Sequence, residues 1–369
     1  MLGGAAFPLA HKWFSAISNP HGAMVDRIGL VWIVLLSLAA QFHGPRLRAD
    51  ERPRLLVLTD IGGDPDDQQS VIRLMVYANE FDIEGLIASA SGTPGELKTA
   101  QTRPDLIREI VSAYGKVQTN LAQHEDGWPA ADDLLSCVKS GNANRGADYI
   151  GAEHDTEGSQ WIVERIGAGA PERPLNISIW GGQTDLAQAL WRVKHDRGVA
   201  GLASFVERFR VYDIGDQDEI ADWIRAEFPG MFYVLAQAPK GSDRRQGTYR
   251  GMYLGGDESL TSREWIEKHV RAAGPLGELY PLNTWTEPNP HGCLKEGDTP
   301  SWFFFLPVGG NDPADPSKPG WGGQYRKSPD GWYRDFPRGR DVDPRESVSR
   351  WRAEFQEDFA RRMSWCLPE

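Results

Sequence analysis

The chain has 369 residues, of which 40% are hydrophobic and 25% are charged. This composition can build a substantial core, so it excludes a wholly disordered protein, and the length fits one large α/β domain or two ordinary domains. The formal net charge of −12 argues against nucleic acid or an anionic membrane as the main partner, because both need a basic surface.

The N-terminal region has the pattern of a secretory leader. Arg27 precedes an uncharged apolar stretch, Ile28–Ala40, after which the chain turns polar. The stretch is short for a membrane span and ends in small residues that suit cleavage. The residues before Met24 do not resemble the start of a leader, so we expect translation to begin at Met24. We therefore predict a signal peptide and N-terminal extension over residues 1–50, an exported domain over 51–369 and no stable membrane insertion after cleavage. A membrane anchor that is not cleaved is the alternative.

Strand-like and helix-like segments alternate along the first two thirds of the exported part. Apolar β-type runs occupy 54–59, 83–91, 175–180, 210–214 and 232–236. Apolar residues at helical spacing occupy 67–81, 106–114, 156–166, 184–195 and 218–228, and again 345–363 near the end of the chain. This alternation predicts an α/β fold in which a mostly parallel sheet is covered by helices on both faces. The region 239–343 is irregular but rich in aromatic residues, which argues against disorder.

The segment that follows the first predicted strand is unusually acidic. Residues 59–69 read TDIGGDPDDQQ and carry Asp60, Asp64, Asp66 and Asp67 around two adjacent glycines. Ligand sites in open α/β sheets form at the carboxyl ends of strands, which is where this loop is expected to lie. Glycines allow tight turns that let several carboxylates point at one spot, and such carboxylates are the ligands that Ca²⁺ prefers. The segment therefore predicts a divalent cation.

Three other interpretations of this loop compete with the cation. An EF-hand that begins at Asp60 would need an acid at its twelfth position, which is Val71, so that interpretation is rejected. The glycine and lysine pattern of a P-loop is absent. An acidic, solvated turn that caps the following helix stays open, because Asp is favourable near a helix N-terminus. One Asp would suffice for a cap, however, and four are present.

The acidic loop resembles the signature of nucleoside hydrolases, which begin with a strand followed by DTDxGxDD. Residues 59–67 read TDIGGDPDD, which keeps TD-x-G and, after two extra residues, DD. This variant is similar to the nucleoside hydrolase-like branch described as cellulose-binding proteins. Later segments that resemble the same branch are WGGQTDLAQAL at 180–190, DQD at 216–218 and NDP…WGGQY within 311–325. The resemblance runs from about residue 54 to residue 363 and implies a nucleoside hydrolase-like fold.

The resemblance also implies roles for individual residues. Asp60 would bind calcium and act as the general base, and Asp67 would be a second metal ligand. Asp66 would contact a sugar hydroxyl. Thr184 would offer its backbone carbonyl to the metal, and Asp312 would complete the metal shell.

The surroundings of Asp312 support two interpretations. It follows the apolar run 302–308 and a Gly-Gly pair, which we interpret as a second strand–Gly–Asp arrangement. An Asx turn before Pro313 is the alternative. Asn311 stands where nucleoside hydrolases often carry a His tied to the leaving base, and we predict that it contacts substrate.

The sequence also offers candidates for a substrate-binding wall and for the acid that protonates the leaving group. Trp321 and Trp302 are candidates for a substrate wall, because tryptophan rings pack well against sugars, and core packing is the alternative for both. The acid that protonates the leaving group is not evident, and the candidates are His154, His291 and Tyr325.

The sequence therefore predicts a calcium-dependent hydrolase of N-glycosidic, nucleoside-like bonds, in which Asp60 activates metal-bound water. The alternative is an exported carbohydrate-binding (cellulose-binding) protein that keeps the fold and the metal without turnover, and a third interpretation is a structural protein with a vestigial loop. The segment that grips ribose in nucleoside hydrolases aligns near 210–212, which lacks its acid and its amide. The expected partner is a sugar-containing small molecule or a polysaccharide, not nucleic acid, and an oligomer is allowed.

Overall fold

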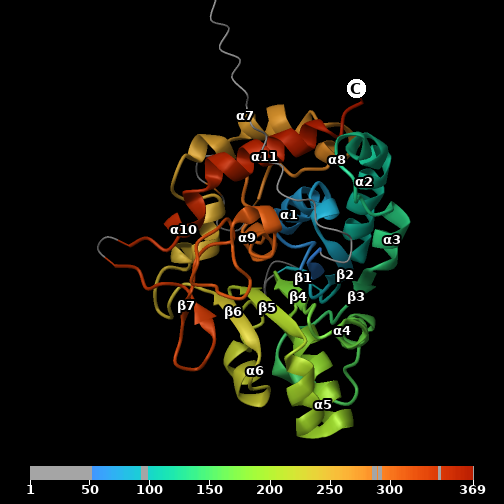
Figure 1. Cartoon of the computed structure of the whole chain (residues 1–369), viewed down its shortest axis with the longest axis vertical. Coiled ribbons are helices and arrows are strands. Elements are labelled where there is room, and N and C mark those ends of the chain that lie inside the picture. The colour runs from blue at the N-terminus through green and yellow to red at the C-terminus, as the bar shows by residue number, and fades with distance from the viewer. Residues whose placement is uncertain (1–51, 93–98, 285–288, 290–292, 340–341, 369) are drawn as a thin grey trace, which may run out of the picture. The chain divides into compact units, whose positions relative to one another are not determined.

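The protein was analysed as a computed structural model, which describes residues 52–92, 99–284, 289, 293–339 and 342–368 (Figure 1). The predicted leader lies outside these residues. Among the helices that are described, none is both long enough and apolar enough to cross a membrane.

The centre of the fold is an eight-stranded sheet with the strand order β3-β2-β1-β4-β5-β6-β8-β7. Its neighbouring strands are parallel except for the β7–β8 pair, so the prediction of a mostly parallel sheet is confirmed. The strands are β1 Arg54–Thr59, β2 Asp82–Ala88, β3 Val138–Ser140, β4 Leu175–Ile179, β5 Phe209–Ile214, β6 Phe232–Ala236, β7 Arg326–Lys327 and β8 Tyr333–Arg334.

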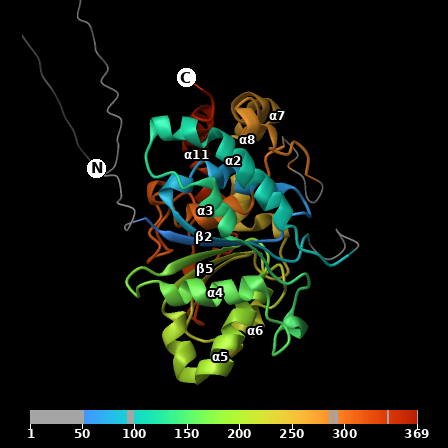
Figure 2. The same cartoon turned by 90° about the vertical axis from the view of Figure 1, so that its right-hand side faces the viewer.

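Helices cover both faces of this sheet, as the alternation of elements predicts (Figure 2). The helices are α1 Asp66–Met75, α2 Pro104–His124, α3 Ala131–Ser136, α4 Glu157–Ala168, α5 Gln183–Val206, α6 Ala221–Glu227, α7 Arg263–Ile266, α8 Gly274–Glu278, α9 Thr299–Phe303, α10 Glu346–Ser349 and α11 Arg352–Ser364. Figure 2 shows α4, α5 and α6 on one side of the sheet and α2, α3 and α11 on the other.

The strand β1 explains why two helical layers are required. Successive side chains of a strand point to opposite faces. Leu55 and Val57 belong to one buried core, together with residues of α1, α2 and α11, whereas Leu56 and Leu58 belong to the core on the face of α4 and α5. All four leucine and valine side chains are fully buried. The carboxyl end of β1 therefore lies in the middle of the sheet, between two packed layers.

The apolar run 302–308 differs from its prediction as a strand. It contains the end of α9, Phe304–Leu306 and a single 3-10 turn over Pro307–Gly309. Pro300 stands in the first turn of α9, where its missing N–H costs nothing. The side chains of residues 302–306 are all buried, so no period of two or 3.6 was visible in the sequence.

Candidate functional site

The acidic loop lies where β1 ends and α1 begins. Asp60 directly follows the strand, and Asp66 and Asp67 form the first turn of α1, where negative charge is favoured by the helix dipole. Gly62 has a φ of +108°, and a Cβ at this position would come within 2.6 Å of the Arg103 side chain, so only glycine fits the turn. Thr59 donates a hydrogen bond to the Asp67 carboxylate, which ties the helix start back to the strand.

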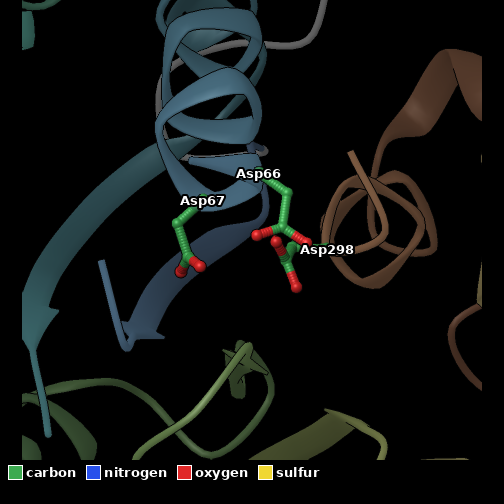
Figure 3. A group of neighbouring side chains, drawn as sticks. All are labelled: Asp66, Asp67 and Asp298. Atoms are coloured by element: carbon green, nitrogen blue, oxygen red, sulfur yellow. The ribbon is translucent and has the colours of Figure 1, made fainter. Parts of the chain in front are cut away.

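Three carboxylates converge beside this turn (Figure 3). Asp66, Asp67 and Asp298 each offer one oxygen, and these oxygens all lie within 4.8 Å of one another. Asp298 comes from the segment just before α9, far from the other two along the chain. Its Oδ2 is buried and has no hydrogen-bond partner, which is a costly arrangement unless a ligand is present.

Burial and mutual repulsion disfavour the ionised form of these carboxylates. Burial raises the pKa of Asp66 to about 6, and it raises the pKa of Asp67 and of Asp298 well above the usual range. The charge of Asp60 adds to the rise of the pKa at all three positions. A bound cation would offset both effects, since it replaces water as the partner of each carboxylate.

Two cationic side chains balance part of this negative charge. The Lys295 Nζ forms an ion pair with Asp64 and lies 3.3 Å from Oδ2 of Asp66. Burial disfavours its ammonium form, but the charges of Asp66 and Asp64 outweigh burial and raise the pKa of Lys295. The Arg145 guanidinium lies 2.6 Å from Oδ2 of Asp60. The sequence analysis predicted a divalent cation as the positive partner of the acidic loop. The structure shows that Lys295 and Arg145 supply two positive charges to this loop.

The segment that carries Lys295 and Asp298 is fastened to α1 by polar contacts. The side-chain oxygen of Gln69 accepts a hydrogen bond from the Lys295 backbone N–H at 2.8 Å, and its nitrogen donates to the Cys293 carbonyl at 2.9 Å. One turn further along α1, Arg73 forms an ion pair with Glu296. These contacts fix the distance between the two halves of the carboxylate group.

Thr184 lies in the first turn of the helix that follows β4, and its hydrogen-bond partners include another acid. Its backbone N–H and its hydroxyl both donate to Oδ2 of Asp218 at 2.7 Å. The preceding turn approaches the site closely, because a Cβ on Gly181 would lie 2.7 Å from Cβ of Asp60. A metal contact from the Thr184 carbonyl stays a prediction.

The structure does not bring Asp312 to the three carboxylates, so its assignment to the metal shell is corrected. The Asp312 side chain is 38% exposed and pairs with Lys318 at 2.7 Å. Its Oδ1 accepts a hydrogen bond from the Ala314 N–H, which is the Asx turn that stood as the alternative. The reason is the helical conformation of α9, whose start, not a strand end, presents an aspartate to the site. Asp298 is that aspartate.

Asn311 and Trp321 act in packing in this structure. Oδ1 of Asn311 accepts a hydrogen bond from the Gly322 N–H at 2.7 Å, and its Nδ2 donates to the Gly323 carbonyl at 2.8 Å. Trp321 is 7% exposed and contacts the rings of Phe303 and Phe355. Neither belongs to the carboxylate group, and their proposed substrate contacts lack support from these surroundings.

The remaining candidates are equally constrained. Trp302 is fully buried among Tyr77, Phe81 and Phe303, which matches the core-packing alternative. Tyr325 is fully buried against Tyr212, and burial raises its pKa well above the usual value, so it is poorly suited to protonate a leaving group.

Of the two histidine candidates for the leaving-group acid, only His154 lies within the described residues. The ring of His154 lies edge-on to that of Tyr149, with 6.1 Å between the centroids. His291 lies outside the described residues. We therefore assign the role of leaving-group acid to neither histidine.

Comparisons with known proteins agree with this architecture. The profile of the family described as "Cellulose-binding Sde182, nucleoside hydrolase-like domain" matches residues 54–325. The chain belongs to this family. A search of the curated proteins found no match.

A solved structure extends the family assignment to three dimensions. It is the nucleoside hydrolase-related hypothetical protein from Saccharophagus degradans, described as associated with carbohydrate metabolism. It superposes with a TM-score of 0.69 and is 29% identical in sequence, over 86% of this chain and 72% of the other. The nucleoside hydrolase-like fold predicted from the acidic loop is therefore confirmed.

Proposed function

We propose that this member of the Sde182 nucleoside hydrolase-like family is a calcium-dependent hydrolase of N-glycosidic bonds. The observation that carries the proposal is the convergence of Asp66, Asp67 and Asp298, whose oxygens lie within 4.8 Å of one another. Oxygen-only ligands of this kind suit Ca²⁺. The unpartnered Oδ2 of Asp298 is the buried acceptor that such an ion would satisfy.

In this proposal the carboxylates at the site have two roles, which are to bind the ion and to accept a proton. Asp66, Asp67 and Asp298 would hold the ion, which when bound supplies Lewis-acid activation of water and a binding point for sugar hydroxyls. Asp60 lies beside the group and would accept the proton of the attacking water. Lys295 contacts Asp66 and lowers its pKa, which opposes the larger rise that burial causes.

A second candidate function is carbohydrate binding without turnover. The family is described as cellulose-binding, and the segment aligned with the ribose-gripping residues of nucleoside hydrolases offers no acid or amide. Tyr212 from that segment points into the core, where it contacts Tyr325 and Phe304. The absence of these groups favours a saccharide ligand other than a nucleoside, with calcium as the shared requirement.

Export of the protein is part of the same proposal. The family is described as cellulose-binding, and a polymer of that size is reached outside the cytoplasm, which agrees with the predicted leader. Detection of the processed chain in periplasm or medium, with a new N-terminus near residue 41, is the expected result. Retention of the unprocessed chain in the cytoplasm would contradict export.

The test separates the two functions from a site that binds nothing. Protein freed of metal with a chelator is titrated with Ca²⁺ by calorimetry, and one ion per chain is expected. It is then assayed with p-nitrophenyl riboside, nucleosides and cello-oligosaccharides, with calcium and with chelator. Calcium-dependent release of product supports the hydrolase. Chelator-sensitive sugar binding without product supports the binding function, and absence of calcium binding contradicts both.

A further inference from the structure

The turn that follows β5 has an unusual backbone conformation. In the described part of the chain, Asp216 and Glu219 are the two non-glycine residues with positive φ, at 54° and 58°. Gly215, which begins the turn, has a φ of +79°. Positive φ costs free energy in residues other than glycine, and it is retained where the surrounding structure requires it, often at a ligand site. Gln217, the glutamine of the DQD motif, stands in the middle of this turn.

The Gln217 side chain reaches from the end of β5 to the neighbouring strand β4. Its Nε2 donates a hydrogen bond to the carbonyl of Trp180, which directly follows β4. The next residue, Gly181, approaches the acidic loop so closely that a Cβ on it would lie 2.7 Å from Cβ of Asp60. Since β4 lies between β1 and β5 in the sheet, Gln217 brings a neutral amide next to the strand ends where the acidic loop begins.

The remaining polar atoms of this amide are available to a ligand. The side-chain oxygen of Gln217 accepts no hydrogen bond from the residues that the structure describes, and the residue is half-buried. Its contact with Trp180 fixes the plane of the amide. An amide offers both a donor and an acceptor, and a hydroxyl group, which also donates and accepts, matches it. Because the amide is neutral, it adds no charge to a site that already holds several carboxylates.

An aromatic ring connects this amide to the segment that carries Asp298. Tyr249 lies in a 3-10 turn after β6 and is half-buried. A Cβ on Gly215 would lie 3.6 Å from the Tyr249 hydroxyl oxygen and 4.0 Å from Cγ of Gln217, so both side chains reach the same glycine. A Cβ on Gly297, the residue before Asp298, would lie 3.3 Å from Cδ2 of the ring. The ring therefore lies between the turn after β5 and the carboxylate group.

The position of Arg250 agrees with this placement of the ring. Its guanidinium carbon lies 5.1 Å from the centroid of the Tyr249 ring. Its charge acts to lower the pKa of Asp298, against the larger rise that burial causes, so Arg250 also lies near the carboxylate group. Ligand sites combine apolar or aromatic walls with a few precisely placed polar groups. Tyr249 and Gln217 offer this combination beside the carboxylates.

We infer that Gln217 and Tyr249 are saccharide-binding residues, with the Gln217 amide on a sugar hydroxyl and the Tyr249 ring against the apolar face of the same sugar. This inference rests on the proposed function. It accounts for the missing ribose-gripping residues near 210–212, because the turn at the end of the same strand supplies an amide in their place. The expected ligand is an uncharged saccharide, since the amide carries no charge and the nearby carboxylates repel an anion.

Calorimetry with the full chain in calcium tests this inference, with cellotetraose and p-nitrophenyl riboside as the two probes. Gln217→Met keeps the length of the side chain and removes the amide, so the probe that binds more tightly should bind about threefold to tenfold more weakly, the usual effect of losing one neutral hydrogen bond. Tyr249→Ala should weaken binding about tenfold, and Tyr249→Phe, which keeps the ring, by at most about twofold. Where the probe is cleaved, these losses should appear in KM and not in kcat.

Two variants elsewhere in the chain control for a purely structural role. Gln118→Met removes another side-chain amide that donates to a backbone carbonyl, that of Pro129 at 2.9 Å. Tyr333→Ala removes another half-buried tyrosine, which packs against Phe232 and has the Lys327 ammonium 5.7 Å from its ring centroid. Both controls should lower the melting temperature without weakening saccharide binding.

The calcium response provides a second readout. Neither Gln217 nor Tyr249 belongs to the carboxylate group. Gln217→Met and Tyr249→Ala should therefore keep the calcium-induced rise in melting temperature that the proposed function predicts, while they lose affinity for the saccharide. A side chain that only supports the carboxylate group would change both properties together.

The outcomes separate this inference from the proposed function. If the unmodified protein binds a probe, and Gln217→Met and Tyr249→Ala weaken that binding no more than the two controls do, the inference is overturned and the proposed function stands. Loss of the calcium response in Gln217→Met or Tyr249→Ala would also overturn the inference, because the side chain then acts through the carboxylates. If the unmodified protein binds neither probe, the saccharide part of the proposed function fails and this inference falls with it.

Discussion

Arg73 of α1 and Glu296 of the segment before α9 form an ion pair in which neither side chain is exposed to solvent. Arg73 also donates to Gln356 of α11 at 2.7 Å, and Glu296 accepts from the Tyr280 hydroxyl at 2.6 Å. The pair connects the two segments that carry the carboxylate group, since Asp66 and Asp67 begin α1 and Asp298 follows Glu296 by two residues. It therefore aligns the halves of the candidate site.

Removal of one partner is predicted to damage both stability and the site. Glu296→Gln leaves the Arg73 charge buried without its carboxylate, which typically costs about 3–5 kcal/mol in the free energy of unfolding. Urea denaturation measures this loss, and calorimetry should show weaker Ca²⁺ binding because Asp298 is no longer held in place. Arg73→Met combined with Glu296→Gln should recover part of the stability.

The half-exposed pair of Arg192 and Asp155 is the control for this prediction. Its nitrogen and oxygen lie 2.6 Å apart, but both side chains contact solvent. Arg192→Gln should therefore change neither the unfolding free energy nor Ca²⁺ binding appreciably. Equal effects of Glu296→Gln and Arg192→Gln would refute the alignment role.

We predict that the Asp298 carboxylate lowers the stability of the metal-free protein and is required for cation binding. Its carboxyl is buried next to Asp66 and Asp60, and its pKa is raised, so the metal-free protein is less stable at neutral pH than it would be with a neutral side chain. Asp298→Asn should raise the melting temperature in chelator by roughly 2–4 °C, the shift expected for a gain of about 1 kcal/mol in a domain of this size. It should also abolish the increase in melting temperature that calcium gives to the unmodified protein.

Asp312→Asn is the matched comparison. It removes an exposed carboxylate that pairs with Lys318, so neither the melting temperature in chelator nor the calcium-induced increase should change. Loss of the calcium effect in Asp312→Asn, with retention in Asp298→Asn, would restore the original assignment of Asp312 and contradict the site described here.

The fold was predicted well from the sequence, because it depends on the spacing of apolar residues within each element and on the order of strands and helices along the chain. The strands β1, β4, β5 and β6 are short apolar runs, and the first three of them are followed by helices; each strand lies within a few residues of its prediction. The short strand β3 was missed, since three residues with one buried side chain leave no pattern. The run 302–308 was misassigned because continuous burial hides the period.

The site was predicted in part, for a related reason. The acidic loop was recognisable in the sequence because it has four aspartates in eight residues, and two of these aspartates belong to the carboxylate group. Asp298 left a weaker signal, a Gly-Asp-Thr-Pro sequence in which the aspartate directly precedes a helix whose first turn contains the proline. Arg145 left none, because a lone arginine in a polar loop says nothing about which strand ends it will reach.

The pH dependence of stability should carry the signature of Asp335. Burial raises its pKa to about 7, although it accepts a hydrogen bond from the Thr248 N–H at 2.7 Å. Below pH 4 the carboxyl is protonated in both states. Between pH 4 and pH 7 the unfolded chain loses this proton while the folded protein keeps it, so the free energy of unfolding falls as pH rises, by at most about 4 kcal/mol for a pKa difference of about three units.

Asp335→Asn removes this titration. The difference in unfolding free energy between the variant and the unmodified protein should shift in favour of the variant from pH 4 to pH 8, as measured by urea denaturation in chelator. Asp330→Asn is the control, because Asp330 is partly exposed, pairs with Arg334 and has a lowered pKa, so it should not shift in this direction. A difference between Asp335→Asn and the unmodified protein that is independent of pH would refute the assignment.

Trp321 is predicted to stabilise the core and not to form a substrate wall. Its ring centroid lies 5.3 Å from that of Phe303 and 6.1 Å from that of Phe355, so Trp321→Ala should cost about 3–5 kcal/mol in unfolding free energy. Trp321→Phe keeps an aromatic ring in the cluster and should cost less, as urea denaturation will show. Cellulose or cello-oligosaccharide binding by Trp321→Phe should equal that of the unmodified protein under conditions where both are folded. A specific loss of saccharide binding in Trp321→Phe, with the unfolding free energy preserved, would show that the ring faces a ligand and would restore its predicted role in a substrate wall.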